Sequence, residues 1–310
     1  MNETGIQWTD VSWNFLRGCS RKSEGCGVDE QGGCYAEKTA YRFSGKGQPY
    51  EGLVRLTKKG PRWTGEVRHL ATKLAEPLSI KKGVRVFVNS MSDFWHDEVS
   101  NQWIAAAFGV MACCPQHQFQ ILTKRPERMP EWFAWVKAQA EAEGDSSPYR
   151  FCVRMAEEVL GKSLTSRIPA IELWPLPNVW LGISAENQER YDERIESLFR
   201  TPAEIRFLSC EPLLGPLSLH LTGIVPSQIR ERYTPASRLI DMVIVGGESG
   251  DRPRPMDLAW ARALRDECQE SGVPFFMKQL GSAGRDDKGG NLDDLPEDLR
   301  IRQFPEGIDP

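Results

Sequence analysis

The chain has 310 residues, of which 40% are hydrophobic and 26% are charged, and its formal net charge is -4. This composition is typical of a globular protein and provides no overall positive charge for binding nucleic acid, although a local basic patch is compatible with it. No segment has the roughly 18 apolar residues of a membrane span, and the polar N-terminus lacks the apolar run of a signal peptide. We therefore expect a cytoplasmic protein with no membrane partner, whose eight cysteines are thiols and not disulfides.

Short apolar runs recur along the chain, and each ends in small or polar residues. They predict strands at 85–89, 119–123, 179–184, 205–209, 242–246 and 274–278, with a further short strand near 11–16. Because the runs are almost continuously apolar, they are typical of strands covered on both faces, as in a parallel sheet. Helices are expected between them, at 100–112, 186–200 and 257–271, with Ser100 and Asp257 as N-caps and Gly272 as a C-terminal stop.

The alternation of strands and helices predicts an α/β fold, a full or partial parallel (β/α) barrel of the TIM type with six to seven strand–helix units. We expect one barrel domain over residues 1–280, with insertions near 55–83, 141–177 and 219–240. The acidic tail at 281–310 is expected to be loosely ordered.

Three cysteines lie close together in a glycine-rich segment that precedes a predicted helix. Cys19, Cys26 and Cys34 fall within sixteen residues, so their thiolates could surround one metal centre. A structural zinc site requires four ligands, and the first histidine of the chain is His69. A [4Fe–4S] cluster bound by three cysteines keeps one iron open to a further ligand, and this centre is our prediction. Packing in the core is expected instead for Cys113, Cys114 and Cys268.

Polar residues follow the predicted strands, at the end where (β/α) barrels carry their chemistry. These residues are Asn89, Ser90, Asp93, Glu186, Glu211, Glu248 and Lys278. Carboxylates, amides and a cation around one pocket favour a zwitterionic ligand, and S-adenosylmethionine (SAM) fits this description. We expect a structural role for His96, beside Trp95, and no catalytic residue is assigned.

A basic segment lies at 55–85, with nine Lys or Arg against two Glu. Nucleic-acid contacts are expected at Lys58, Lys59, Arg62 and Arg68, and Trp63 could stack on a base. The alternative for this segment is a solvated basic surface without a ligand.

The sequence resembles a family of phage- and prophage-encoded proteins of unassigned function that carry a three-cysteine motif. The resemblance covers most of the chain in order, through TDVSWNFLRGC, CYAEK, VFVNSMSDFWH, FQILTKRP, NVWLGISAENQ, RFLSCEPLLG, DMVIVGGESG, RPM and PFFMKQLG. That family in turn is similar to the radical SAM enzymes, as a divergent branch. The usual radical SAM loop has three and then two residues between its cysteines, whereas six and seven separate them here. An expanded loop at 27–33 is therefore expected, and loops tolerate such insertions well.

This resemblance implies an iron–sulfur enzyme that uses SAM, receives an electron from a donor and modifies a nucleic acid or nucleotide. The Gly246–Gly247–Glu248 triplet is similar to the GGE triplet of radical SAM enzymes, although it follows a late strand instead of the second. The alternative is a phage protein without catalysis, which binds nucleic acid and holds a structural zinc ion.

Overall fold

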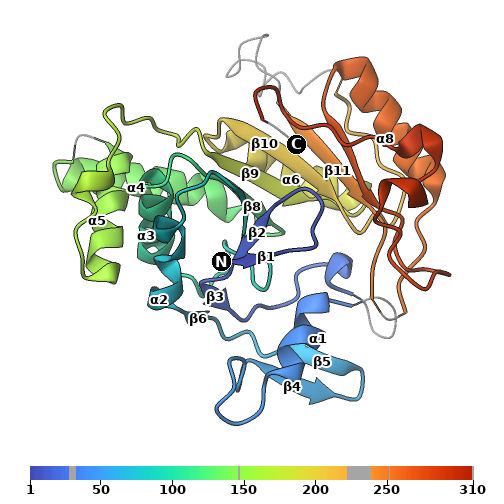
Figure 1. Ribbon diagram of the computed structural model, residues 1–310, viewed down its shortest axis with the longest axis horizontal. Helices are drawn as coiled ribbons and strands as arrows, with labels where there is room; N and C mark the ends of the chain where they lie inside the picture. The colour runs from blue at the N-terminus through green and yellow to red at the C-terminus, as the bar shows by residue number, and fades with distance from the viewer. Residues whose placement is uncertain (28–32, 146, 222–238, 251, 309–310) are drawn as a thin grey trace. The chain divides into compact units, whose positions relative to one another are not determined.

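The structure is a computed structural model that describes residues 1–27, 33–145, 147–221, 239–250 and 252–308 (Figure 1). The described residues form two compact units that are interleaved along the chain. The first comprises Met1–Arg21, Ala36–Leu181 and Arg200–Glu204, and the second comprises Lys22–Tyr35, Gly182–Phe199 and Ile205–Pro310. The chain thus passes from the first unit to the second within the segment that carries the three cysteines.

A mostly parallel sheet of eight strands confirms the predicted α/β class. Its order is β1 (Asn2–Glu3), β2 (Val11–Trp13), β7 (Arg85–Val88), β8 (Gln118–Thr123), β9 (Val179–Ser184), β10 (Ile205–Cys210), β11 (Met242–Gly246) and β12 (Phe275–Gln279). β2–β7, β7–β8, β10–β11 and β11–β12 pair in parallel, whereas the short β1 pairs antiparallel with β2. The barrel itself stays a prediction.

The strands form where the apolar runs predict them, and the runs of β9 and β11 are buried on both faces. All residues of β9 and of β11 are buried. Gly182 in β9 lies directly against a ring of the next strand, since a Cβ there would be 2.5 Å from the Phe207 side chain. Only glycine therefore permits this packing of β9 and β10.

In the first unit, three helices pack together (Figure 1). They are α3 (Asn101–Ala112), α4 (Arg128–Ala142) and α5 (Pro148–Leu160). The predicted cap of α3 is confirmed, because the Ser100 hydroxyl accepts a hydrogen bond from the amide of Trp103 at 3.3 Å. α4 was not predicted from the sequence, and α5 lies within the predicted insertion near 141–177.

Smaller elements complete the first unit. They are a β3–β6 pair (Leu16–Arg17 and Arg68–His69), the helix α1 (Tyr35–Arg42, whose first residue belongs to the second unit), a β4–β5 hairpin (Val54–Thr57 and Gly60–Trp63), the helix α2 (Ala71–Leu74), and two 3₁₀ turns, η2 (Glu76–Ser79) and η3 (Thr165–Arg167). The predicted insertion near 55–83 contains most of this hairpin together with β6, α2 and η2.

In the second unit, helices follow β9 and β11. They are α6 (Gln188–Arg200) and α8 (Leu258–Ser271), together with the turns η1 (Glu24–Cys26), η4 (Leu292–Asp294) and η5 (Glu297–Leu299). The predicted ends of α8 are confirmed. The Asp257 carboxylate accepts from the Ala259 amide at 2.8 Å, and Gly272 ends the helix with φ 66°.

The C-terminal segment differs from the loose tail that the sequence predicts. Its backbone pairs with β12 through Met277 N to Ile301 O at 2.8 Å and Gln303 N to Phe275 O at 3.0 Å. Leu295 and Leu299 are buried. Apolar residues that recur inside an acidic segment therefore anchor it, although its overall composition is polar.

Most of the predicted insertion near 219–240 lies outside the described residues. Among the helices that the structure describes, none is long and apolar enough to cross a membrane.

Candidate functional site

The three loop cysteines differ from the other five in exposure. Cys19, Cys26 and Cys34 are partly exposed and not in disulfides. The remaining five are buried, including Cys113, Cys114 and Cys268, which confirms the predicted packing role of these three. Burial raises the pKa of Cys113 to about 11 and of Cys114 and Cys268 to about 12. Because the thiolate is the form that binds metals, the loop cysteines are the favourable ligands of this chain.

The three loop cysteines are divided between the two units. Cys19 lies in the first unit, while Cys26 ends η1 and Cys34 directly precedes α1, both in the second. Within the described ranges, no three His, Cys, Asp or Glu side chains are grouped as metal ligands. Residues 28–32, the centre of the predicted expanded loop, lie outside the description.

The surroundings of Cys19 include a buried guanidinium. Burial lowers the pKa of Arg125, but attraction by Asp93 and by the Cys19 sulfur outweighs it, so this pKa is raised. A buried cation therefore lies near the first of the three loop cysteines.

Asp93 lies at the centre of a buried polar network in the first unit. Its carboxylate accepts hydrogen bonds from the Thr123 hydroxyl at 2.7 Å and from the Trp95 amide at 3.0 Å. It also accepts from the Lys124 amide and from Arg125, each at 3.2 Å. Asp93 is 7% exposed and Arg125 is 3% exposed, so the carboxylate is enclosed by protein donors.

This network reaches the cysteine segment through Ser20. Arg125 donates to the Ser20 carbonyl at 2.9 Å and to its hydroxyl at 2.7 Å. His96 Nε2 lies 2.8 Å from the same hydroxyl, and His96 Nδ1 accepts from the Glu98 amide. The proton of the neutral ring is therefore on Nε2, and burial, followed by repulsion from Arg125, lowers the His96 pKa. In this tautomer His96 donates to Ser20 and cannot act as its base, which agrees with the expected structural role.

Asn89 and Ser90 connect the end of β7 to the segment before Cys19. The Asn89 side-chain oxygen accepts from the Leu16 amide at 3.2 Å, and Ser90 exchanges hydrogen bonds with Asn14 at 3.1 and 3.3 Å. Asn89 adopts φ 58°, a left-handed conformation that asparagine tolerates. Its buried side-chain nitrogen has no hydrogen-bond partner among the described residues and can donate to a ligand.

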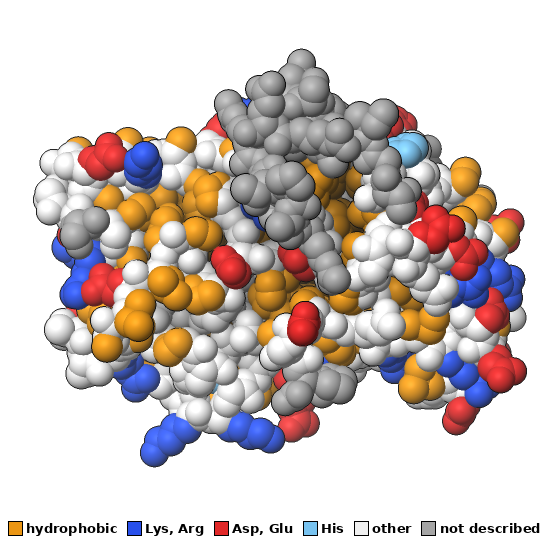
Figure 2. Space-filling view, turned by 90° about the horizontal axis from the view of Figure 1, so that it is seen from above, with side chains coloured by type: hydrophobic (Ala, Val, Ile, Leu, Met, Phe, Trp, Pro, Cys, Tyr) orange, Lys and Arg blue, Asp and Glu red, His pale blue; other side chains and the backbone are white. Residues whose placement is uncertain are grey.

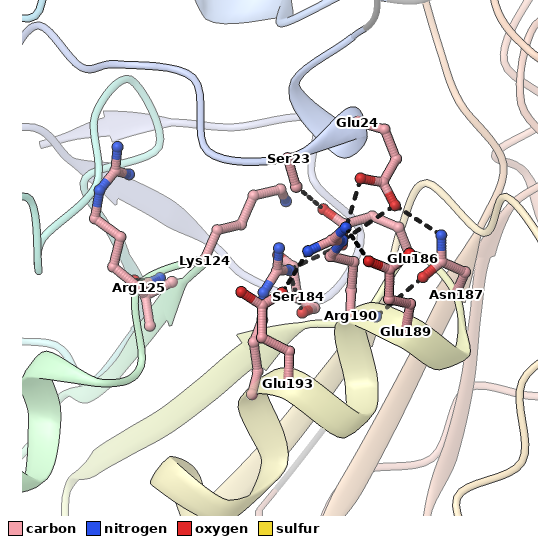
Figure 3. Close-up of polar contacts among 12 residues, drawn as sticks. Ser23, Glu24, Lys124, Arg125, Ser184, Glu186, Asn187, Glu189, Arg190 and Glu193 are labelled. Carbon is pink, nitrogen blue, oxygen red and sulfur yellow. Dashed lines mark hydrogen bonds and ion pairs between the residues drawn. The ribbon is translucent and has the colours of Figure 1, made fainter.

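Glu186 is completely buried in the second unit (Figure 3). One carboxylate oxygen lies 2.8 Å from Nη1 of Arg194, and the other accepts from the Ser23 hydroxyl at 2.9 Å. Arg194 also donates to the Ser184 carbonyl at 2.8 Å. Glu186 thus lies between α6 and the turn that leads to Cys26.

Glu211 and Lys278 form a more accessible ion pair at the ends of β10 and β12. Lys278 Nζ lies 2.5 and 2.6 Å from the two carboxylate oxygens, and Gln279 donates to the first of them at 3.1 Å. Their side chains are 17% and 13% exposed. Burial, followed by repulsion from Lys278, lowers the pKa of Lys288, which places a second cation in this neighbourhood.

Glu248 has a bidentate partner in Arg254, at 2.7 and 2.8 Å, and accepts from the Arg254 amide at 2.9 Å. Every predicted strand-end carboxylate therefore has a protein cation as partner. The sequence analysis missed Arg194 and Arg254 in this role. Arg254 stands in the RPM segment, six residues after Glu248, and no local spacing in the sequence indicates the pairing of Glu186 with Arg194.

The basic residues of the 55–85 segment divide into two groups. Lys58 and Lys59 are exposed at the turn of the β4–β5 hairpin. Arg68 pairs with Glu66 at 2.9 Å, and Arg62 lies 3.8 Å from the buried Glu37. On the face drawn in Figure 2, basic and acidic side chains are interspersed, and neither sign occupies it alone.

No curated protein and no solved structure matches this chain. A family model described as "Protein of unknown function (DUF5131)" matches residues 3–298, which is nearly the whole sequence. The chain therefore belongs to this DUF5131 family.

Proposed function

We propose that the chain is a radical SAM-like iron–sulfur enzyme of phage or prophage origin, with a [4Fe–4S] cluster bound by Cys19, Cys26 and Cys34. The observation that carries the proposal is the contrast in exposure: these three thiols are accessible, and the other five are buried. Three ligands leave one iron open, as a cluster that binds a substrate requires. The parallel sheet supports a partial (β/α) barrel, in which the strand ends would carry the site.

A cluster of this kind supplies one electron to SAM, whose cleavage gives methionine and a carbon radical. The protein must then bind SAM, orient it and exclude water. An external electron donor and a nucleic acid or nucleotide substrate complete the proposed reaction.

Exposure divides the predicted SAM-binding residues into two roles. The side chains of Asp93, Glu186 and Glu248 are 9%, 0% and 5% exposed, and each is paired with an arginine. Because these carboxylates are buried and paired, we assign them to holding the neighbouring backbone in place and not to direct contact with a ligand. Glu211 and Lys278 are more accessible, so Glu211 can bind the SAM ammonium group while Lys278 binds its carboxylate.

The direct test is methionine release from SAM by anaerobically reconstituted protein with a chemical reductant. We expect release only when iron, reductant and SAM are all present, and none from Cys34→Ala. Protein with a full complement of about four irons per chain that neither binds nor cleaves SAM would refute the SAM-dependent function.

The second candidate is a nucleic-acid-binding protein with a structural zinc ion. The exposed Lys58 and Lys59 at a hairpin turn favour it, because two exposed cations at one turn can contact adjacent phosphates. Metal analysis separates the candidates: purified protein with one bound zinc and no ability to take up iron would support this second function.

A further inference from the structure

We propose that Glu186 is a positioning residue that fixes the turn carrying Cys26, and is not itself a ligand of SAM. The geometry of the turn stands by itself, whereas its consequence for a metal centre rests on the function proposed above. Three observations within the second unit carry the inference: the ion pair of Glu186, the contact with Gly25 and the neighbouring bonds of Glu24.

The first observation is the enclosed carboxylate. Arg194, 2% exposed, holds one oxygen of Glu186, and the Ser23 hydroxyl donates to the other at 2.9 Å. Both oxygens are thus engaged by protein groups on opposite sides of the carboxylate. In a buried site these interactions are stronger than at the surface, so the carboxylate is fixed and Ser23 is fixed with it.

The second observation is the absence of a side chain at position 25. A Cβ on Gly25 would lie 1.9 Å from Oε1 and 2.5 Å from the carboxyl carbon of Glu186. A flexible glutamate could move aside, but this one is held by Arg194. Glycine is therefore required for the turn to lie against the carboxylate.

The third observation is a parallel set of bonds from the next residue. Glu24 accepts from the Asn187 side chain at 2.7 Å and lies 3.2 Å from Nε of Arg190 (Figure 3). Consecutive residues of the turn are therefore bound to the end of β9 and the start of α6. Within the turn, the Cys26 amide donates to the Ser23 carbonyl at 2.9 Å, so the position of Cys26 follows from that of Ser23.

The expected consequence is a Cys26 thiol that is held in one place before any metal binds. If the clamp is removed, the turn samples more conformations and the thiol becomes more accessible to reagents. Preorganised ligands also bind a metal more favourably, since less conformational entropy is lost on binding.

The test uses full-length, metal-free protein and measures the rate at which iodoacetamide alkylates Cys26, by mass spectrometry of its peptide. Ser23→Ala is the main variant, because it removes one loop bond and leaves the Glu186–Arg194 pair intact. Glu186→Gln and Gly25→Ala are the companion variants. Asp298→Asn is the control, because the Asp298 side chain is 44% exposed and pairs with Arg262 and Arg265 on α8.

We expect alkylation of Cys26 to accelerate by about tenfold in Ser23→Ala, because this variant loses one hydrogen bond to a charged group. The rate should be unchanged in the Asp298→Asn control, and the thermal midpoint of Ser23→Ala should stay close to that of the wild type. Equal Cys26 rates in wild type, Ser23→Ala and folded Glu186→Gln would overturn the positioning role.

A second readout separates this inference from the proposed function. After anaerobic reconstitution, the reduction potential and visible spectrum of the cluster should differ between wild type and Ser23→Ala. A faster Cys26 reaction in a chain that takes up no iron would support the clamp and refute the cluster. A normal cluster together with unchanged Cys26 reactivity would support the cluster and refute the clamp.

Discussion

Lys278 Nζ lies between the two carboxylate oxygens of Glu211, at 2.5 and 2.6 Å, in an ion pair that keeps some exposure. Glu211 follows β10 and Lys278 lies in β12, so the pair joins the ends of strands on either side of β11. Under the proposed function, SAM would replace this ion pair with two new ones. Its ammonium group would pair with Glu211, and its carboxylate would pair with Lys278.

The first prediction concerns this pair. Glu211→Gln should weaken SAM binding by about thirty- to a thousandfold, or roughly 2–4 kcal/mol, because Lys278 keeps its charge while the ammonium group loses its partner. Calorimetric titration of SAM into reconstituted protein measures the effect. Asp298→Asn, a change in a surface ion pair of the same unit, is the control and should bind as the wild type does. Equal affinity in wild type and Glu211→Gln would place SAM elsewhere.

The second prediction concerns the buried pair of Asp93 and Arg125. Asp93→Asn should lower the free energy of unfolding by about 3–5 kcal/mol, because it leaves the Arg125 charge buried without a partner. The double variant Asp93→Asn/Arg125→Gln should lose much less than the sum of the single changes. Urea denaturation of the three variants measures this coupling. Additive losses would show that the two side chains do not depend on each other.

The third prediction concerns pH. Burial is the main cause that lowers the pKa of His69, His96 and His117 below the ordinary value of 6.5. These histidines therefore bind protons at a higher pH in the unfolded chain than in the folded chain. For this reason the free energy of unfolding should fall as the pH drops below about 6.5. The carboxylates with lowered pKa values have ordinary pKa values of 3.8 or 4.5, so their protonation changes the free energy of unfolding only at lower pH.

Urea denaturation between pH 7.5 and 5 measures this loss. His96→Gln should show a smaller loss than the wild type over the same range. A free energy of unfolding that is constant across the range would contradict the assigned neutral state of these histidines.

The fourth prediction concerns the hairpin turn. Lys58→Gln/Lys59→Gln should weaken binding to a single-stranded oligonucleotide and reduce the slope of log K against log salt by about 1 to 2. Arg68→Gln should change the slope less, because Arg68 already has Glu66 as a partner. Fluorescence anisotropy across a salt series provides both slopes. Wild-type protein without affinity at low salt would exclude this surface as a nucleic-acid site.

The strands and their order along the chain could be predicted because their signals are local. The runs at β7 to β12 match the structure within two residues, and the caps Ser100 and Asp257 act as expected. α4 was missed because its apolar residues are mixed with charges and do not form a clear stripe. The acidic tail was mistaken for a loose segment because its few buried leucines are outweighed by its composition.

The residues of the site could be chosen from the sequence, but their partners could not. Ser23 and Glu186 are 163 residues apart, and Ser20 and Arg125 are 105 apart. Such contacts depend on how the chain folds back, which no local pattern specifies. For the same reason the sequence placed Glu186 among ligand-binding carboxylates, although its burial and its contact with Gly25 favour a role in holding the turn.

The cluster itself is tested most directly by anaerobic reconstitution with iron and sulfide, followed by iron analysis and visible absorption. Single alanine variants of Cys19, Cys26 and Cys34 are compared with Cys268→Ser, a change at a buried thiol of the same chain. We predict about four irons per chain and a charge-transfer absorption in wild type and Cys268→Ser, and loss of both in each loop variant. Full iron content and an unchanged spectrum in Cys26→Ala would contradict the three-cysteine centre.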